Sequence, residues 1–166
     1  STFLVAKAFI ESNPNLPVRL LSHPNYANLG VGASRLLGIK EAKGSFVCFL
    51  DADDCFFPQK VERQIECFRH NPSIVLCHTA VQVFGDTSDP VSHEKHFSCS
   101  PSEPYQLARC EKFLFRLHVL TSSVMIQVAA LEGLRYPSRM SNDSEDWLLF
   151  VLISGKGDFI QLPECL

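Results

Sequence analysis

The sequence lacks most of the short motifs that would place it in a common protein class at once. Its seven cysteines are odd in number and include no CxxC pair, so neither a disulfide framework nor a zinc ribbon is indicated. Reduced, mostly buried thiols in a cytoplasmic protein fit this pattern better. There is no GxGxxG fingerprint and no GKS or GKT element, so neither a dinucleotide site nor a P-loop is predicted.

Long apolar runs and strong charge are missing as well. No apolar run reaches the roughly 18 residues that a membrane span needs, and the start of the chain shows no signal-peptide pattern. The formal net charge of −3 gives no reason to expect DNA or an anionic membrane as a partner. At 166 residues, the chain is expected to form one domain, residues 1–166, that buries a substantial core.

The hydrophobic pattern predicts strands that alternate with helices. Helices are expected at 2–12, 31–44, from Pro58 to the HNP sequence at 70–72, 105–117 and 145–154, and strands at 18–22, 45–50, 74–85, 123–128 and 158–162. The polar stretches 85–104 and 136–143 are expected to be loops. The helix that begins near Pro58 should bury Val61, Ile65 and Phe68. This alternation is typical of a layered α/β fold.

Three carboxylates follow an apolar run in FLDADDCFFP, residues 49–58. Asp51, Asp53 and Asp54 come just past the end of a predicted buried strand, the edge at which α/β sheets bind ligands. One interpretation is structural, with aspartates that form the turn and Asp54 as cap of the next helix. The other is functional, with carboxylates that hold Mg²⁺ or Mn²⁺, cations that usually share their oxygen ligands with substrate phosphates.

A second acidic pair, Glu145 and Asp146, begins the predicted helix at 145–154. Acidic residues are favoured there by the helix dipole without any function, so the residues alone leave a catalytic role open. Trp147 is expected either to shape an acceptor site or to belong to the core. Cys77 and His78 lie in a predicted strand and are interpreted as core rather than as a nucleophile with its base.

Several motifs in a fixed order resemble one family. The stretch NLGVGASRLLGIKEAKGSFVCFLDADDCFFPQKVERQ (28–64) resembles the nucleotide-sugar-binding half of a family 2 glycosyltransferase with the GT-A fold. TSSVMIQVAALEGL (121–134) and SEDWLLFVLISGKG (144–157) resemble the family's C-terminal part. The resemblance implies a Rossmann-like α/β/α fold with a mixed, mainly parallel sheet. It also implies a fragment, truncated at both ends, whose first strand and nucleotide-binding loop would precede Ser1.

The resemblance implies an inverting, hexosyltransferase-type enzyme that moves a sugar from a nucleotide sugar, UDP-sugar above all, to a hydroxyl acceptor. A divalent cation, Mn²⁺ or Mg²⁺, would neutralise the leaving diphosphate. In the family pattern, Asp53 would ligate the cation, Asp51 would support it and contact the donor, and Asp54 is a looser candidate. The family's Glu-Asp motif matches Glu145 and Asp146, and Asp146 would be the general base.

Other matched positions would contact the donor, and one departs from the pattern. The predicted donor-binding residues are Asn28, Gly30 and Arg35, together with Asp51 and Asp53. Leu36 stands where the family usually has Asn, so donor recognition there differs. Two other functions stay open: a nucleotidyltransferase, and a non-catalytic GT-A-like interaction module. Some family members glycosylate a modified tRNA base, a branch that the net acidity does not favour.

Overall fold

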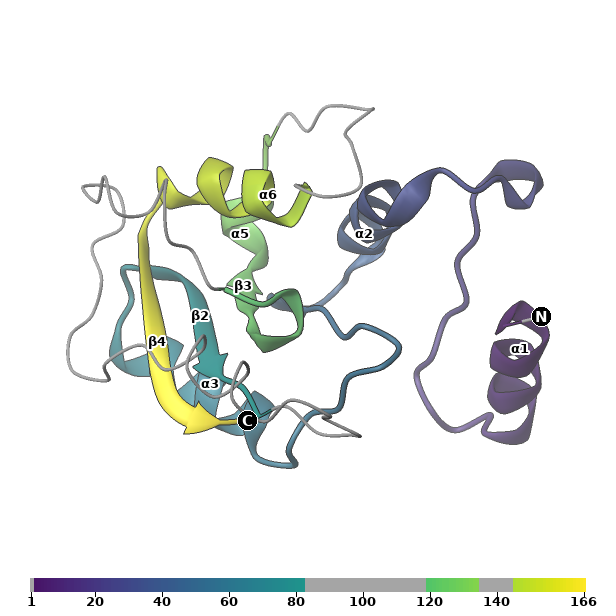
Figure 1. Ribbon diagram of the computed structural model, residues 1–166, viewed down its shortest axis with the longest axis horizontal. Helices are drawn as coiled ribbons and strands as arrows, with labels where there is room; N and C mark the ends of the chain where they lie inside the picture. Colours follow the sequence, from purple (N-terminus) through teal and green to yellow (C-terminus); the bar gives the residue numbers. More distant parts are fainter. Residues whose placement is uncertain (1, 83–118, 135–144) are drawn as a thin grey trace, which may run out of the picture. The chain divides into compact units, whose positions relative to one another are not determined.

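A computed structural model describes residues 2–82, 119–134 and 145–166. The predicted helix at 105–117, the predicted loops at 85–104 and 136–143, and the end of the predicted strand at 74–85 lie outside the described residues. Contacts divide the chain into two compact units, Ser1–Glu41 and Ala42–Leu166 (Figure 1). The single domain over residues 1–166 stays a prediction.

The first unit contains helix α1 (Thr2–Ser12), the short 3-10 helix η1 (Pro24–Tyr26) and helix α2 (Gly30–Glu41). The two helices confirm those predicted at 2–12 and 31–44, although α2 ends earlier. The strand predicted at 18–22 is wrong: this segment has no strand. A strand needs a partner for its main-chain groups, and the described part of this unit offers none.

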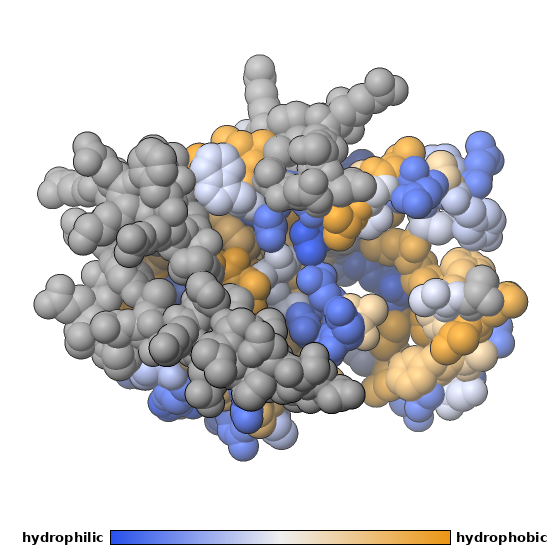
Figure 2. Space-filling view, in the orientation of Figure 1, coloured by the Kyte–Doolittle hydropathy of each residue, from blue (hydrophilic) through white to orange (hydrophobic). Residues whose placement is uncertain are grey.

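Apolar side chains of the first unit stay accessible. Neither α1 nor α2 contains a buried residue. In α1, Leu4, Val5 and Phe9 are all exposed, and Figure 2 shows apolar surface over this helix. The unit is tied together by an edge-on contact between the rings of Phe3 and Tyr26, whose centroids are 5.2 Å apart, and by an ion pair between Arg19 and Glu41. Its helices are therefore held by few contacts within the unit.

The second unit contains a four-stranded sheet in the order β1-β3-β2-β4. The strands are β1 (Phe46–Cys48), β2 (Ile74–Ala80), β3 (Met125–Gln127) and β4 (Asp158–Cys165), and the helices are α3 (Lys60–His70), η3 (Thr121–Ser123), α5 (Val128–Leu131) and α6 (Glu145–Ser154). The strand β3 is antiparallel to both of its neighbours, whereas β2 and β4 are parallel and lie side by side in Figure 1. The sheet is mixed, as expected, but is partly rather than mainly parallel in the described residues.

The core of the second unit covers both faces of the sheet. One cluster of buried side chains contains Cys67 and Phe68 of α3 together with Ile74, Cys77 and Met125 of the strands. Side chains of neighbouring strand residues point to opposite faces, and these neighbours are fully buried as well, namely Leu76, Ile126 and Phe159. Because apolar side chains on both faces are removed from water, the layered α/β architecture is confirmed.

Helix α3 buries only part of the face that the sequence predicted: Phe68 is buried and Ile65 packs against the core cluster, whereas Val61 does neither. It begins two residues after Pro58, and its buried residues are Lys60, Gln64, Cys67 and Phe68. Their spacing of four, three and one follows one helix face. Val61, which was predicted to be buried, is 46% exposed, so that prediction is wrong. The buried face differs from the predicted one there because two long polar side chains, rather than Val61, fill the space next to the sheet.

Candidate functional site

The acid loop, residues 51–54, is held through its main chain. The strand β1 ends at Cys48, and the Asp51 N–H donates to Ser122 Oγ over 3.0 Å. The Asp54 N–H donates to the Asp51 carbonyl over 3.1 Å, which closes a turn. Asp51 is half-buried, whereas Asp53 and Asp54 are exposed. Asp54 does not cap α3 as the structural interpretation expected, because the N-cap of that helix is Gln59 and makes no side-chain cap bond.

The start of α6 is held through a side chain. Asp146 Oδ2 accepts a hydrogen bond from Thr121 Oγ1 over 2.9 Å, and Asp146 Oδ1 accepts one from the Trp147 N–H over 2.7 Å. Glu145 is only 5% exposed. The Trp147 side chain is 39% exposed, so it does not belong to the core. The structure thus fixes the carboxylate of Asp146 at the first turn of the helix, where the helix dipole favours an anion.

The turn η3 contacts both acidic segments. Thr121 binds the Asp146 carboxylate, and its neighbour Ser122 accepts from the main chain of Asp51. The next carbonyl, that of Ser123, accepts from Gln64 Nε2 over 3.0 Å. Sequence reasoning used this segment only for the resemblance and gave its hydroxyls no role, because Thr and Ser before a strand are ordinary turn residues. The turn brings the acid loop and the start of α6 together.

A buried polar network supports this turn from α3. Lys60 has no exposed surface, and its Nζ donates to Gln64 Oε1 over 2.5 Å. The ammonium lies 4.5 Å from the centre of the Phe56 ring, a favourable cation–π contact. Gln64 Nε2 also donates to the Cys77 carbonyl over 2.9 Å. Burial lowers the pKa of Lys60, since the charged form loses its hydration.

Cys77 and His78 belong to the core, as the sequence predicted. Cys77 has no exposed surface and His78 only 6%. Burial raises the pKa of the Cys77 thiol, so the reactive thiolate is disfavoured. Burial also lowers the pKa of His78 to about 4, which keeps its ring neutral near pH 7. A thiol that stays protonated and a ring of low basicity, on opposite faces of the strand, make a poor nucleophile pair.

The predicted donor residues Asn28, Gly30 and Arg35 belong to the first unit, whereas the carboxylates belong to the second. Asn28 Oδ1 accepts a hydrogen bond from the Gly30 N–H over 3.1 Å, at the start of α2. Gly30 has a φ of 86°, a conformation that favours glycine. Arg35 is half-buried. Asn28 and Gly30 therefore shape the beginning of α2, and the donor contacts of all three residues stay predictions.

The carboxylates fit one kind of divalent cation site. Within residues 2–82, 119–134 and 145–166, no three His, Cys, Asp or Glu side chains gather as a metal cluster would. The exposed carboxylate of Asp53 and the half-buried Asp51 are hard oxygen ligands, which Mg²⁺ and Mn²⁺ accept. Such a pair suits a cation that takes its remaining ligands from substrate phosphates and water, rather than one enclosed by protein.

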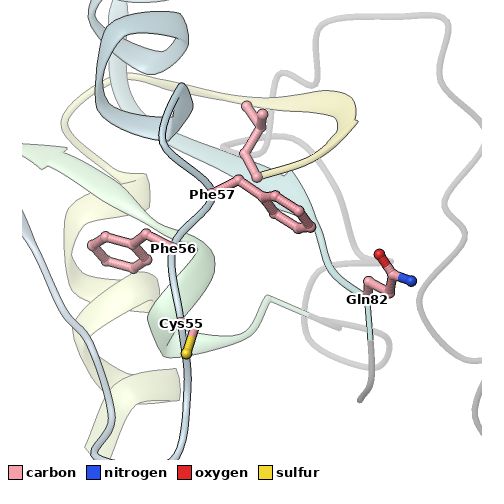
Figure 3. A pocket seen from close by; sticks show the side chains of 5 residues that line it. Cys55, Phe56, Phe57 and Gln82 are labelled. Atoms are coloured by element: carbon pink, nitrogen blue, oxygen red, sulfur yellow. The ribbon is translucent and has the colours of Figure 1, made fainter.

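A pocket of about 270 Å³ is lined in part by the residues that follow the acid loop in the chain. Its lining residues are Cys55, Phe56, Phe57, Gln82 and Leu166. Figure 3 shows the Phe56 and Phe57 rings on opposite sides of the backbone, with the Phe57 ring directed toward the side of Gln82. The lining contains no charged side chain. The groups suited to a diphosphate or a cation therefore come from the acid loop and not from this pocket.

Comparisons with known proteins agree with this architecture. The family model for glycosyl transferase family 2 matches residues 5–134. An uncharacterized glycosyltransferase of Methanocaldococcus jannaschii is 26% identical over 159 residues, which are 94% of this chain and 53% of the relative. A putative glycosyltransferase of Bacillus subtilis, EpsH, is 31% identical over 80 residues, 47% of this chain and 23% of the relative. The chain thus spans about half, or less, of the relatives it matches.

A solved structure has the same fold. The crystal structure of S. aureus TarS 1-349 aligns with a TM-score of 0.69 at 18% identity, and the match covers 99% of this chain and 46% of TarS. The layered α/β fold with its mixed sheet is therefore the GT-A fold. The family match defines the class further: the chain belongs to glycosyl transferase family 2.

In the described part of the chain, no helix is both long and apolar enough to cross a membrane.

Proposed function

We propose that the protein is an inverting glycosyltransferase that moves a sugar from a UDP-sugar to a hydroxyl acceptor. Membership of glycosyl transferase family 2 supports a nucleotide-sugar donor. The single observation that carries the proposal is the turn η3, whose adjacent residues Thr121 and Ser122 bind Asp146 and the Asp51 main chain. A transferase needs a base and a site for the leaving diphosphate within reach of one sugar, and this turn joins a candidate for each.

Asp53 and Asp51 would hold Mn²⁺ or Mg²⁺ at the acid loop. Bound there, the cation would act as a Lewis acid that neutralises the charge developing on the leaving diphosphate. The exposed side chain of Asp53 is accessible to a cation that arrives with the donor. Asn28, Gly30 and Arg35 remain the candidates for contacts with the rest of the donor.

Asp146 would accept the proton of the acceptor hydroxyl. Its carboxylate is oriented by Thr121 and the Trp147 N–H, as a base must be to meet one particular proton. Attack of the deprotonated hydroxyl on the face opposite the diphosphate inverts the anomeric carbon. Glu145, the other residue of the predicted catalytic pair, is only 5% exposed and would support Asp146 at the start of the helix.

The test combines binding with turnover in the wild type, Asp53→Ala and Asp146→Asn. We expect UDP to bind by calorimetry only with Mn²⁺, and Asp53→Ala to lose this binding. Asp146→Asn should bind UDP like the wild type, while its kcat falls by about 10²- to 10⁴-fold, the usual share of a general base. Glu62→Gln, which changes an exposed acidic residue of α3 outside the proposed site, is the control and should bind UDP normally.

Other outcomes would favour the rival functions. A wild type that ignores Mn²⁺ and a panel of nucleotide sugars would favour a non-catalytic interaction module. Release of pyrophosphate from a nucleoside triphosphate would indicate a nucleotidyltransferase.

A cytoplasmic location also stays a prediction, and cell fractionation tests it. It is supported by the free cysteines Cys48, Cys55, Cys67, Cys77 and Cys165.

A further inference from the structure

The turn η3 is a rigid part of the second unit. The Val124 N–H donates to the Thr121 carbonyl over 3.3 Å, and Ser123 Oγ donates to the Leu120 carbonyl over 2.7 Å. Thr121 and Ser123 are buried, and the chain continues directly into β3, which is paired on both sides. Groups on this turn therefore occupy fixed positions relative to the sheet.

The Thr121 hydroxyl restricts the Asp146 carboxylate in a specific way. An ionised carboxylate has about four acceptor positions, two on each oxygen. The described residues fill one on Oδ2, from Thr121, and one on Oδ1, from the Trp147 N–H. With one bond on each oxygen, the carboxylate plane cannot rotate without breaking a bond. Among the bonds between described residues, one position on each oxygen is left for the proton of an acceptor hydroxyl.

The Ser122 hydroxyl acts on a different segment. It accepts the N–H of Asp51, the first carboxylate of the acid loop, over 3.0 Å. The bond joins residues that are 71 positions apart in the sequence. It fixes the main chain at the point where the loop leaves β1, and hence the direction in which the loop presents its side chains.

We propose that Thr121 and Ser122 are a pair of positioning residues with separable roles. Thr121 orients Asp146 to accept the proton, and Ser122 orients the acid loop to bind the donor diphosphate. Neither touches the reacting atoms, so each acts through the carboxylate segment that it holds. This inference rests on the proposed function of Asp146 and the acid loop.

The Thr121 role is tested by removing the hydroxyl and then restoring it. Thr121→Val keeps the branched shape without the donor, and Thr121→Ser keeps the donor without the methyl group. We expect Thr121→Val to lower kcat by about tenfold or more. Its donor KM and its affinity for UDP with Mn²⁺ should stay within about twofold of the wild type. Thr121→Ser should recover kcat to within about threefold.

Ser122 should show the opposite division. Ser122→Ala removes the acceptor for the Asp51 N–H, and we expect a roughly three- to tenfold weaker affinity for UDP with Mn²⁺. The kcat at saturating donor should change by less than about twofold. Ser122→Thr keeps the oxygen and should restore affinity. If the roles are separate, the double variant Thr121→Val/Ser122→Ala should show both effects at their single-variant sizes.

Several results would overturn the inference. It is wrong if Thr121→Val keeps its kcat, if Thr121→Ser fails to restore it, or if both single variants lose kcat and affinity in equal measure. If the wild type transfers no sugar, the proposed function fails independently of the pair. Crystal structures of the variants then test whether the two residues position their partners. An Asp146 side chain that keeps its orientation in Thr121→Val, or an acid loop that does not move in Ser122→Ala, would overturn the inference.

Discussion

The two acidic segments of the second unit are held in opposite ways. The acid loop is fixed by main-chain hydrogen bonds of Asp51 and Asp54, while the side chain of Asp53 is exposed. At the start of α6, the carboxylate of Asp146 is itself the anchored group. A cation ligand must adapt to a donor that arrives from solution, whereas a general base must already be oriented toward the proton that it accepts. The difference in anchoring therefore matches the two proposed roles.

The largest expected effect comes from lengthening the side chain of Asp146 by one methylene, and the same change at Asp53 is the comparison. Asp146→Glu moves the carboxylate by more than 1 Å from both of its anchors, and a displacement of that size in a catalytic group costs about 10²-fold in kcat. Asp53→Glu lengthens an exposed side chain that can adapt, so its kcat and its affinity for UDP with Mn²⁺ should each fall by less than about tenfold. Steady-state kinetics and calorimetry measure both.

The same pair of variants can contradict the comparison. If Asp53→Glu is the more damaging change, the acid loop is the more tightly defined site, and the difference in anchoring does not reflect function. Thermal unfolding of both variants is the control, because a Tm near that of the wild type shows that the kinetic loss is local.

The second-largest expected effect is a loss of stability when the buried network around Gln64, which supports the turn η3, is broken. Gln64→Leu is nearly isosteric but removes the donor to the Cys77 and Ser123 carbonyls and the acceptor for the buried Lys60. A buried polar group without its partner costs about 1–3 kcal/mol, and more if charged. We expect a loss of about 2–4 kcal/mol in the free energy of unfolding, measured in urea.

Glu62 offers a matched control on the same helix. Glu62→Gln changes an exposed residue of α3 and should alter stability by less than about 0.5 kcal/mol. If Gln64→Leu is as stable as the wild type, the network does not support the turn η3. Anchoring of the acidic segments would then come from the sheet alone.

Patterns in the sequence predicted the fold better than they predicted contacts between distant segments. Periodicity located α1, α2, α6 and all four strands of the sheet, because regular apolar spacing follows the geometry of helices and strands. It failed at residues 18–22, where the apolar residues have no strand to pair with in the described unit. It predicted the burial of Phe68 in α3 but missed that of Lys60 and Gln64, since hydrophobicity alone cannot show that these two satisfy one another.

The candidate site was predicted only in part, because sequence patterns do not show contacts between distant segments. The acid loop and the pair at 145–146 stand out as clustered charges, and their order resembled a family. Thr121 and Ser122 carry no such signal, because a hydroxyl becomes informative only once its partner is known. Those partners lie 25 and 71 positions away in the chain. Only the fold brings them together.

The smallest expected effect is a response to acid that belongs to the core and not to either acidic segment. The pKa of His78 is about 4 in the folded protein, against an ordinary value of 6.5 for histidine. Between these pH values His78 is protonated in the unfolded chain but not in the folded chain. The contribution of His78 to the free energy of unfolding is therefore fully present above pH 6.5 and falls as the pH drops toward 4. At about 1.4 kcal/mol per unit, the loss is up to about 3 kcal/mol.

Urea unfolding at pH 7 and pH 4.5 in the wild type and His78→Phe measures this response. The wild type should lose more stability than His78→Phe, because the phenyl ring cannot take up a proton. His70→Gln changes an exposed histidine, keeps the buried ring and should follow the wild type. If His78→Phe loses as much as the wild type, the acid response comes from the carboxylates.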